Sequence, residues 1–407
     1  MPVPQPLFTL LAGRRRWALA AAAAGLLGAA APVQAADFWR RIDQPAPIAS
    51  GLDGQPHEAT CSGWPGTDPS YRFWTRKGKS SNLVVYFEGG GACWDDLTCT
   101  FGMGRGIPSA VPQFYNPALP PGSAPRDTSG LFDNQNPANP VKDWTGVYIP
   151  YCTGDVHIGS ADRTYNNYGH PTKPLPSQFT IRHRGFDNFM VVMDWVQKNI
   201  APPKQLLVTG ASAGGYGASA NFPWVAKAFP NAQLSVLADA SQGVTTAGFE
   251  GGLPGRKSWN PQLAPWVFGN DPNAVGSGEL LRVGAQAYPN GRFGQYTNVA
   301  DEVQIGFYSV MKQFYGPGGA CPDPAADWSQ QMLGRLASYT ATLPNFRSYT
   351  NPGTAHTILR SPTYYAASTT GTPFAAWLGT LVNRNGAPWV DAVCPHCLVP
   401  IACNAVP

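Results

Sequence analysis

The segment QLLVTGASAGGYG, at residues 205–217, contains Ser212, the side chain best placed to do chemistry in this chain. An apolar run ends at Gly210, and an alanine-rich stretch that suits a helix begins after Gly215. A G-x-S-x-G pattern between a strand and a helix is typical of a nucleophile elbow, whose sharp turn lifts a serine hydroxyl above the end of a sheet. The sequence therefore predicts Ser212 as a nucleophile. The alternative is an ordinary glycine-rich turn, with or without a bound phosphate.

A nucleophilic serine needs a base, and the chain offers few candidates. A serine hydroxyl is a weak nucleophile at neutral pH, so a base must take its proton and a carboxylate must orient that base. Two histidines follow the serine, His356 and His396. His356 lies in a loop after a predicted late strand, where α/β-hydrolases carry their base, whereas His396 lies between two cysteines. We therefore expect His356 to be the base, against the alternative of a surface loop histidine.

The orienting acid is less well defined by the pattern. In α/β-hydrolases it lies between the serine and the histidine in chain order, which leaves Asp239, Asp271, Asp301 and Glu302 as candidates. Asp301 follows an apparent strand at 295–298, later than the strand directly after the elbow, which is the usual place for the acid. We expect Asp301, with Asp239 as the alternative. Either aspartate could instead cap a helix or a turn.

Acyl transfer also requires backbone N–H groups that stabilise the oxyanion of the tetrahedral intermediate. Ala213, directly after the candidate nucleophile, is expected to supply one of them. The loop Gly89-Gly90-Gly91 follows an earlier apolar run and is expected to supply the other through Gly90 or Gly91. Glycine suits this place because the backbone must approach the substrate without a side chain in between. The alternatives are a plain flexible turn or a phosphate cradle.

Apolar runs alternate with helical patterns along much of the chain. Strands are predicted at 71–75, 83–88, 146–152, 205–210, 234–238 and 345–350, helices at 186–200, 303–314 and 328–339, and loop-rich stretches at 102–143 and 251–298. Strands that alternate with helices favour the α/β class, here an α/β-hydrolase-like, mostly parallel sheet with helices on both faces and long loop insertions. No linker is evident, so one domain is expected over residues 36–407.

The first 35 residues have the pattern of a secretory signal peptide. Three arginines at 14–16 precede an apolar run at 17–31, and small residues then allow cleavage after Ala35 or Ala36. The alternative is a retained membrane anchor, although the run is short and rich in alanine. We therefore expect a secreted or periplasmic protein, with no stable membrane anchor after cleavage.

Composition narrows the classes of partner. The chain has 407 residues, 13% of them charged, with 45 glycines and 41 prolines, which favours long irregular connections over a helical bundle. The formal net charge is +4, and three of the positive charges lie in the predicted signal peptide. This balance does not favour nucleic-acid binding.

Eight cysteines, an even number, suggest disulfides in an exported chain. They are Cys61, Cys93, Cys99, Cys152, Cys321, Cys394, Cys397 and Cys403. Cys93 and Cys99 are near enough in sequence to close a small loop. Near the C-terminus, Cys394, His396, Cys397 and Cys403 could instead bind zinc, but a second CxxC pair is missing, so disulfides and no metal are expected.

Four segments together resemble the pectin acetylesterase and Notum family. They are YFEGGGACW at 86–94, VYIPYCTGDVHIG at 147–159, GASAGGYG at 210–217 and LADASQG at 237–243. Their order is that of the family, and the resemblance extends over about residues 57–360. It implies a secreted α/β-hydrolase that removes acyl groups from esters. Plant members deacetylate pectin, and Notum removes a lipid acyl group from a signalling protein.

The resemblance also assigns roles by position. The family's nucleophile falls on Ser212, its base on His356, and its acid on Asp301 within VADEVQIG. Its oxyanion donors fall near Gly90, Gly91 and Ala213. This sequence departs from Notum at Gly91 and Ala92, where Notum has aromatic residues, and the C-terminal cysteine-rich region does not align.

These observations predict a secreted serine carboxylesterase that acts on short acyl esters, mainly acetyl groups on a polysaccharide. The partner is then an ester substrate, and no metal or organic cofactor is expected. One alternative is a lipase or polyester depolymerase, which would need a long apolar acyl pocket. Another is a non-catalytic carbohydrate-binding protein, whose tryptophans would stack on sugar rings.

Overall fold

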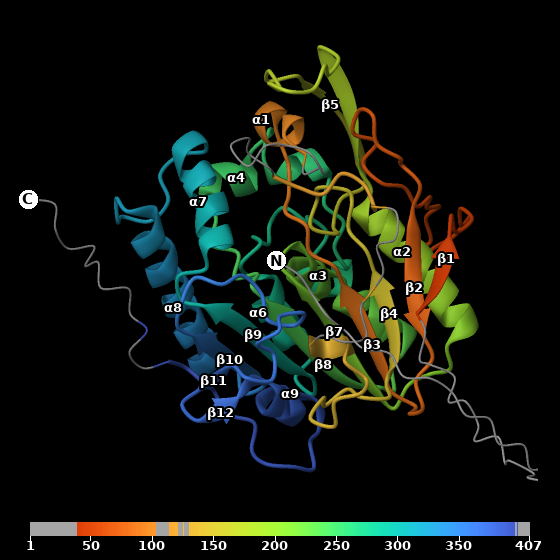
Figure 1. The fold of residues 1–407 in the computed structure, drawn as a ribbon, viewed down its shortest axis with the longest axis vertical. Helices are drawn as coiled ribbons and strands as arrows, with labels where there is room; N and C mark the ends of the chain where they lie inside the picture. Colours follow the sequence, from red (N-terminus) through yellow and green to blue (C-terminus); the bar gives the residue numbers. More distant parts are fainter. Residues whose placement is uncertain (1–38, 103–113, 121–124, 126–129, 395–396, 398–407) are drawn as a thin grey trace, which may run out of the picture. The chain divides into compact units, whose positions relative to one another are not determined.

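The computed structural model describes residues 39–102, 114–120, 125, 130–394 and 397. Its centre is an eight-stranded sheet in the order β1-β2-β4-β3-β7-β8-β9-β10 (Figure 1). The strands of this sheet are β1 (Arg40–Asp43), β2 (Arg72–Arg76), β3 (Leu83–Phe87), β4 (Thr145–Ile149), β7 (Gln205–Ala211), β8 (Gln233–Asp239), β9 (Arg292–Asn298) and β10 (Phe346–Asn351). The predicted strands are all present, each within three residues of its expected bounds.

The sheet is parallel except at β2. This strand pairs antiparallel with both β1 and β4, and every other neighbouring pair is parallel. A mostly parallel sheet in which the second strand alone is reversed is the arrangement of an α/β-hydrolase, and the predicted fold class is confirmed. The carboxyl ends of the parallel strands meet at one edge of the sheet, which is where such sheets place their ligand sites.

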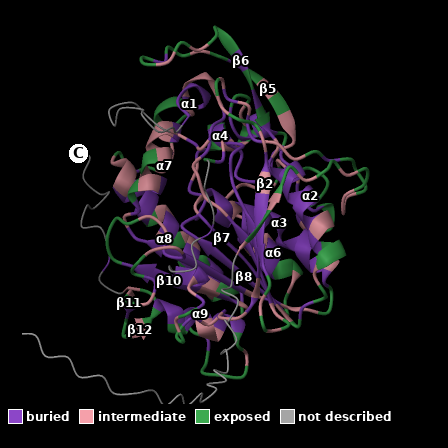
Figure 2. Ribbon diagram, turned by 45° about the vertical axis from the view of Figure 1, so that its right-hand side comes forward, coloured by how far each residue is buried: buried purple, intermediate pink, exposed green. Residues whose placement is uncertain are grey.

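Helices cover both faces of the sheet. They are α1 (Asp96–Thr100), α2 (Gly185–Asn199), α3 (Ala213–Ala228), α4 (Ala247–Gly251), α5 (Pro265–Phe268), α6 (Leu280–Ala287), α7 (Glu302–Phe314), α8 (Pro324–Thr342) and α9 (Phe374–Val382), with short 3-10 turns η1 (Gly130–Phe132) and η2 (Arg256–Trp259). Residues of α2, α3, α6 and α8 share one hydrophobic cluster with the sheet, and α9 and η1 share the other. The central strands and the helix faces that meet them are buried (Figure 2).

Strand β3 shows why the sheet holds two cores. Successive side chains of a strand point to opposite faces. Accordingly Val85 and Phe87 lie in the cluster beneath α2 and α3, whereas Val84 and Tyr86 lie in the cluster beneath α9. All five residues of β3 are buried. A strand covered on both sides reads as a continuous apolar run, and this is the pattern that identifies β3 in the sequence.

Several elements were not predicted. The hairpin of β5 (Ala161–Asn166) and β6 (Gln178–His183) lies outside the main sheet, and β6 alternates exposed and buried residues along its length. Helix α6 begins within the stretch 251–298, which was expected to be loop-rich. A further small sheet pairs β11 (Ser368–Thr369) with β12 (Thr372–Pro373) just before α9. These elements are short or rich in Gly and polar residues, so their local pattern resembles that of loops.

Disulfides connect distant parts of the chain, as the cysteine count suggests. Cys61 bonds to Cys152 across 91 residues, and Cys93 bonds to Cys99 in the small loop that was predicted. Cys394 bonds to Cys397, which favours the disulfide interpretation of this motif over zinc. Cys321 is also disulfide-bonded, while His396 and Cys403 lie outside the described residues.

The predicted signal peptide, residues 1–35, also lies outside the described residues, so cleavage after Ala35 or Ala36 stays a prediction. The expected extent of the domain, residues 36–407, also stays a prediction. Within the described part of the chain, no helix is both long and apolar enough to cross a bilayer.

The disulfide between Cys61 and Cys152 closes a long loop, so its removal should destabilise the fold. We expect the double variant Cys61→Ala/Cys152→Ala to lose about 2–5 kcal/mol of unfolding free energy, since a reduced chain gains conformational entropy on unfolding. Urea denaturation measures this loss. The matched variant Cys93→Ala/Cys99→Ala closes a much shorter loop and should lose less; an equal or larger loss would contradict the entropic argument.

Candidate active site

Ser212 lies on a strained turn between β7 and α3. Its backbone angles are φ 59° and ψ −126°, a conformation that non-glycine residues rarely adopt and that costs about 1–3 kcal/mol. Its N–H donates to the carbonyl oxygen of Asp239 at 2.8 Å. A Cβ atom on Gly214 would lie 2.0 Å from the carbonyl oxygen of Phe87, so the end of β3 excludes any side chain there. The turn therefore has the strain and the small neighbours that the pattern predicted.

His356 lies beyond the end of β10 and contacts Asp301, which follows β9. The Nδ1 atom of His356 is 2.9 Å from both carboxylate oxygens of Asp301. The side chain of Asp301 is fully buried, and that of His356 is 17% exposed. A buried carboxylate at Nδ1 places the proton on that nitrogen and leaves Nε2 free to accept. The arrangement matches that of an orienting acid and a base.

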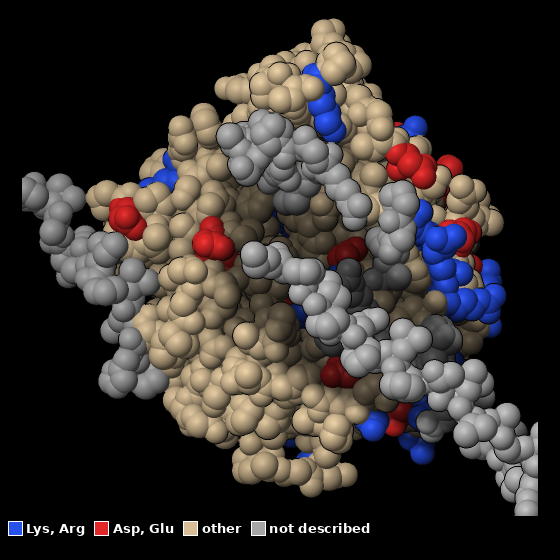
Figure 3. All heavy atoms as spheres, in the orientation of Figure 1, with Lys and Arg blue, Asp and Glu red and all other residues tan. Residues whose placement is uncertain are grey.

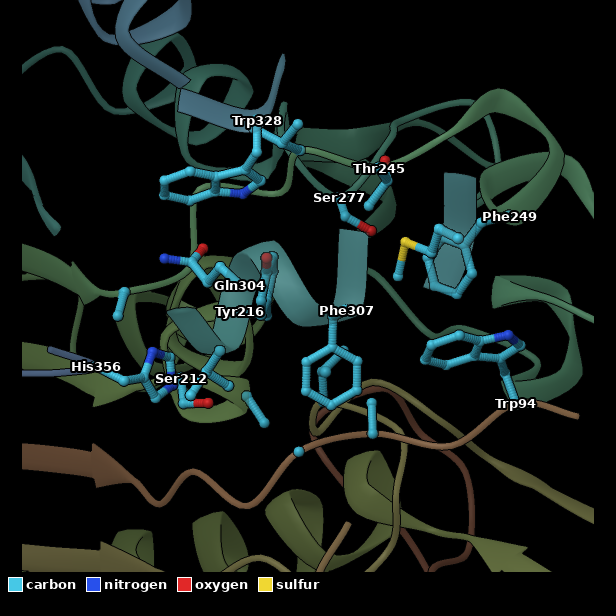
Figure 4. A pocket seen from close by; sticks show the side chains of 18 of the residues that line it. Trp94, Ser212, Tyr216, Thr245, Phe249, Ser277, Gln304, Phe307, Trp328 and His356 are labelled. Carbon is cyan, nitrogen blue, oxygen red and sulfur yellow. The ribbon is translucent and has the colours of Figure 1, made fainter. Parts of the chain in front are cut away.

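The Nε2 atom of His356 is turned toward the candidate nucleophile. It is buried, and it has no hydrogen-bond partner among the described residues. Ser212 and His356 line the same pocket and lie next to each other at its left side in Figure 4. No hydrogen bond joins the two side chains in the described structure. In enzymes without bound substrate such contacts are often long, and they shorten in the reacting complex.

Asp301 also has the second role that the sequence allowed. It is the N-cap of α7, and its Oδ1 atom accepts hydrogen bonds from the N–H groups of Val303 and Gln304. The side-chain amide of Gln304 donates to the other carboxylate oxygen at 3.0 Å. These donors hold the carboxylate in place for the imidazole. Helix cap and contact with the histidine are thus compatible at this residue.

Asp239, the alternative acid, makes no hydrogen bond to His356. Its Oδ2 atom accepts from the N–H groups of Ile358 and Leu359, at 2.9 Å each, just after the histidine. Its carbonyl oxygen accepts the N–H of Ser212. The residue therefore braces both the elbow and the histidine loop. Burial raises the pKa of its carboxyl from 3.8 to about 7, and the two backbone donors oppose that rise.

The glycine loop lies against the elbow. A Cβ atom on Gly89 would lie 2.8 Å from that of Ser212. Gly91 has φ +76° and lines the pocket together with Ala213, whereas Gly90 is not among the lining residues. The N–H of Ala213, at the first turn of α3, has no acceptor inside its helix. Gly91 and Ala213 are therefore the better placed of the three predicted oxyanion donors.

Two contacts hold the glycine loop. The Nε2 atom of His157 lies 2.8 Å from the carbonyl oxygen of Glu88, directly before the loop. The carboxylate of Glu88 is 3.4 Å from a guanidinium nitrogen of Arg360, four residues beyond the candidate base. Burial raises the pKa of the Glu88 carboxyl, and the charge of the neighbouring Arg360 opposes part of this rise. This ion pair joins the oxyanion side of the site to the histidine loop. No local pattern in the sequence indicates this ion pair, since 272 residues separate the partners.

The pocket beside Ser212 is lined mainly by apolar side chains. It holds about 620 Å³ of empty space, part of it open to solvent. Phe307 lies near its middle, and Trp94 and Phe249 lie at the end away from Ser212 (Figure 4). No pattern in the sequence assigned these aromatics to the site. Trp94 belongs to the EGGGACW segment, the one signal that could have identified it.

A group of potential metal ligands lies elsewhere in the described part of the chain. The sulfur atoms of Cys93 and Cys99 and a ring nitrogen of His183 lie within 4.8 Å of one another. The two sulfurs are joined in a disulfide, and His183 is hydrogen-bonded to Tyr165 and to the carbonyl oxygen of Thr153. A disulfide supplies no thiolate for a metal, so this group is structural.

The raised pKa of Asp239 predicts how stability depends on pH. Because the folded pKa, about 7, exceeds the usual 3.8, the wild type should lose stability as pH rises from about 4 to about 7, at up to about 1.4 kcal/mol per pH unit. Asn cannot ionise. The unfolding free energy of Asp239→Asn minus that of the wild type should therefore be higher at pH 8 than at pH 5, as measured by urea denaturation. A difference that does not change with pH would contradict the assignment.

Part of the chain is similar in sequence to known carboxylesterases. Residues 52–249 match the family described as Pectinacetylesterase. The palmitoleoyl-protein carboxylesterase notum2 of Xenopus laevis is 25% identical over 164 residues, 40% of this chain and 29% of that protein. The palmitoleoyl-protein carboxylesterase NOTUM of Schmidtea mediterranea is 26% identical over 145 residues, 35% of this chain and 24% of that protein. The chain thus aligns with less than a third of the length of these curated relatives.

Proposed function

Because residues 52–249 belong to the pectinacetylesterase family, we propose that the chain is a secreted serine carboxylesterase that removes short acyl groups, mainly acetyl, from a polysaccharide. The observation that carries the proposal is one arrangement of three side chains. Ser212 lies on a strained elbow in the same pocket as His356, and His356 is hydrogen-bonded to the buried Asp301. All three follow the carboxyl ends of parallel strands, namely β7, β9 and β10.

The arrangement supports a two-step mechanism. The Oγ atom of Ser212 attacks the ester carbonyl while Nε2 of His356 takes the serine proton. Asp301 holds Nδ1–H and stabilises the imidazolium. The N–H groups of Gly91 and Ala213 stabilise the oxyanion. The intermediate then expels the alcohol, which receives the proton from His356. Water, activated by the same histidine, hydrolyses the acyl-enzyme and restores the serine.

Secretion is supported by the cysteines as well as by the N-terminal sequence. Disulfides persist in oxidising compartments and are rare in the reducing cytosol. The disulfide between Cys61 and Cys152 joins the segments before β2 and after β4. Export to an oxidising compartment would allow this bond to form and persist. Export to the periplasm or to the exterior fits this chemistry equally well.

The pocket favours a second candidate function, an esterase for longer acyl chains such as a lipase or polyester depolymerase. An acetyl group needs space for a single methyl. The pocket instead extends from Ser212 to Trp94 and Phe249. Val244 and Met311 are also among its apolar lining residues. Burying each CH2 group of an acyl chain in such surroundings contributes about 0.8 kcal/mol. Acetyl and longer acyl esters must therefore be compared directly.

Substitution of the candidate triad tests the proposed chemistry. Ser212→Ala should lower kcat on p-nitrophenyl acetate by roughly 10⁶-fold, because the nucleophile is removed. Asp301→Asn should lower it by roughly 10⁴-fold, because the histidine loses its oriented tautomer. Steady-state kinetics of the purified protein measures both. Turnover of Ser212→Ala near the wild-type level would refute the proposal, and failure of the wild type to react with a fluorophosphonate probe would favour a non-catalytic scaffold.

A pair of matched variants on α7 distinguishes the two acyl classes. Phe307 lines the pocket, whereas Phe314, on the same helix, is 53% exposed and is not among the lining residues. If long chains occupy the pocket, Phe307→Ala should lower kcat/KM for p-nitrophenyl octanoate about tenfold, the loss of about 1.4 kcal/mol of apolar contact, with little change for acetate. Phe314→Ala should change neither. Equal effects of Phe307→Ala on both esters would favour the acetyl esterase.

A further inference from the structure

A basic groove lies at the edge of the sheet opposite the candidate active site. We define it by Lys204, Lys227, Arg292, Arg347 and Arg384, which line two adjoining hollows. Lys204 directly precedes β7, and Arg292 is the first residue of β9. These positions mark the amino ends of the parallel strands, whereas Ser212, Asp301 and His356 follow their carboxyl ends. The two hollows share Arg384 and residues 289–291, so they form one continuous groove.

The groove concentrates positive charge on a chain with little net charge. Among the described residues, no Asp or Glu lines either hollow. The formal net charge of the whole chain is only +4, and the three arginines at 14–16 precede the described residues. Charged side chains are sparse over much of the face shown in Figure 3. The lining of the groove therefore has five cations and no carboxylate, an arrangement that attracts anions.

The arginines of the groove lie close enough to repel one another. The guanidinium carbons of Arg292 and Arg347 lie 5.4 and 5.6 Å from the centre of the same ring, Trp389. Desolvation lowers the pKa of Arg292, and the charge of Arg347 lowers it further. Desolvation followed by the charge of Arg292 likewise lowers the pKa of Arg384. A bound anion would relieve this repulsion.

The cationic side chains of the groove also have hydrogen-bond donors that no described acceptor uses. The Nε atom of Arg384 is buried and has no hydrogen-bond partner among the described residues. Arg347 has an acidic neighbour outside the lining, with its Nε 3.8 Å from the carboxylate of Asp391. Lys204, Lys227, Arg292 and Arg384 form no ion pair with any residue that the structure describes. The groove thus has guanidinium and ammonium donors available for a ligand.

We propose that the basic groove binds an acidic polysaccharide through the carboxylates of its sugars. Guanidinium groups match carboxylates in shape and charge. The neutral amides of Asn231 and Asn290 also line the groove and suit sugar hydroxyls. Trp266 lies at one end with 46% of its surface exposed, and the Nζ atom of Lys227 lies over its ring, 4.6 Å from the ring centre. The identification of the anionic ligand as a glycan rests on the proposed function. The positive charge of the groove is observed independently of that function.

The aromatic side chains argue against single-stranded nucleic acid. Such ligands need successive exposed rings on which bases stack. Trp389 is only 8% exposed and is flanked by Arg292 and Arg347, so Trp266 is the one well-exposed aromatic among the residues that line the groove. A glycan held here would tether the protein to an acidic matrix and leave the candidate active site, at the far edge of the sheet, free to act on another stretch of polymer.

Binding measurements with charge-reversed lysines test the proposal. Lys204 and Lys227 are exposed, so Lys204→Glu/Lys227→Glu should fold, and thermal unfolding checks this. The full chain should bind de-esterified polygalacturonate in affinity electrophoresis at 20 mM NaCl, and binding should weaken at 200 mM NaCl. We expect the double variant to bind at least tenfold more weakly. The charge-matched control Lys173→Glu/Lys257→Glu, outside both hollows, should bind like the wild type.

Three outcomes would overturn the proposal. They are equal binding by the wild type and the groove variant, equal binding to neutral galactan, and tighter binding to poly-dT, which would assign the groove to nucleic acid. If Lys204→Glu/Lys227→Glu fails to fold, Arg347→Gln provides a second variant, with an expected loss of threefold or more. The experiment measures binding and not ester cleavage. A chain without esterase activity would therefore not alter the interpretation of the binding result.

Discussion

The buried carboxylate of Asp239 is the constraint on which the candidate active site depends. Its side chain holds the N–H groups of Ile358 and Leu359, and its carbonyl oxygen holds the N–H of Ser212. One residue at the end of β8 therefore fixes the nucleophile turn on one side and the histidine loop on the other. The residue is fully buried, and its other carboxylate oxygen has no partner among the described residues. Such an arrangement costs desolvation energy, which the packed sheet must offset.

The remaining parts of the site are arranged around this brace by the parallel sheet. The carboxyl ends of the six parallel strands from β4 to β10 in the sheet order meet at one edge, so residues that are far apart in sequence become neighbours there. Asp301 is held by the first turn of α7, and Glu88 pairs with Arg360 between the glycine loop and the histidine loop. Each functional group is thus positioned by at least one contact that does not involve substrate. Preorganisation of this kind is what electrostatic stabilisation of a transition state requires.

The two edges of the sheet have opposite character. The carboxyl edge holds an apolar pocket beside Ser212, and the amino edge holds the basic groove. Apolar lining suits the acyl part of an ester, and guanidinium groups suit a carboxylated polymer. If both proposals hold, the two surfaces bind different parts of one class of substrate, an esterified acidic glycan. The core between them, built on the alternation of β3 and its neighbours, keeps the edges apart.

The sequence by itself determined the fold class, the strands on either side of the elbow and the turn at Ser212, because continuous apolar runs and small flanking residues are local signals. It also determined the glycine loop and the one histidine beyond a late strand. Only the tertiary structure decided which aspartate contacts His356, since 55 residues separate Asp301 from it and periodicity carries no information on such contacts. The tertiary structure likewise decided the aromatic lining of the pocket and the basic groove. Their residues come from separate elements that meet only when the sheet forms.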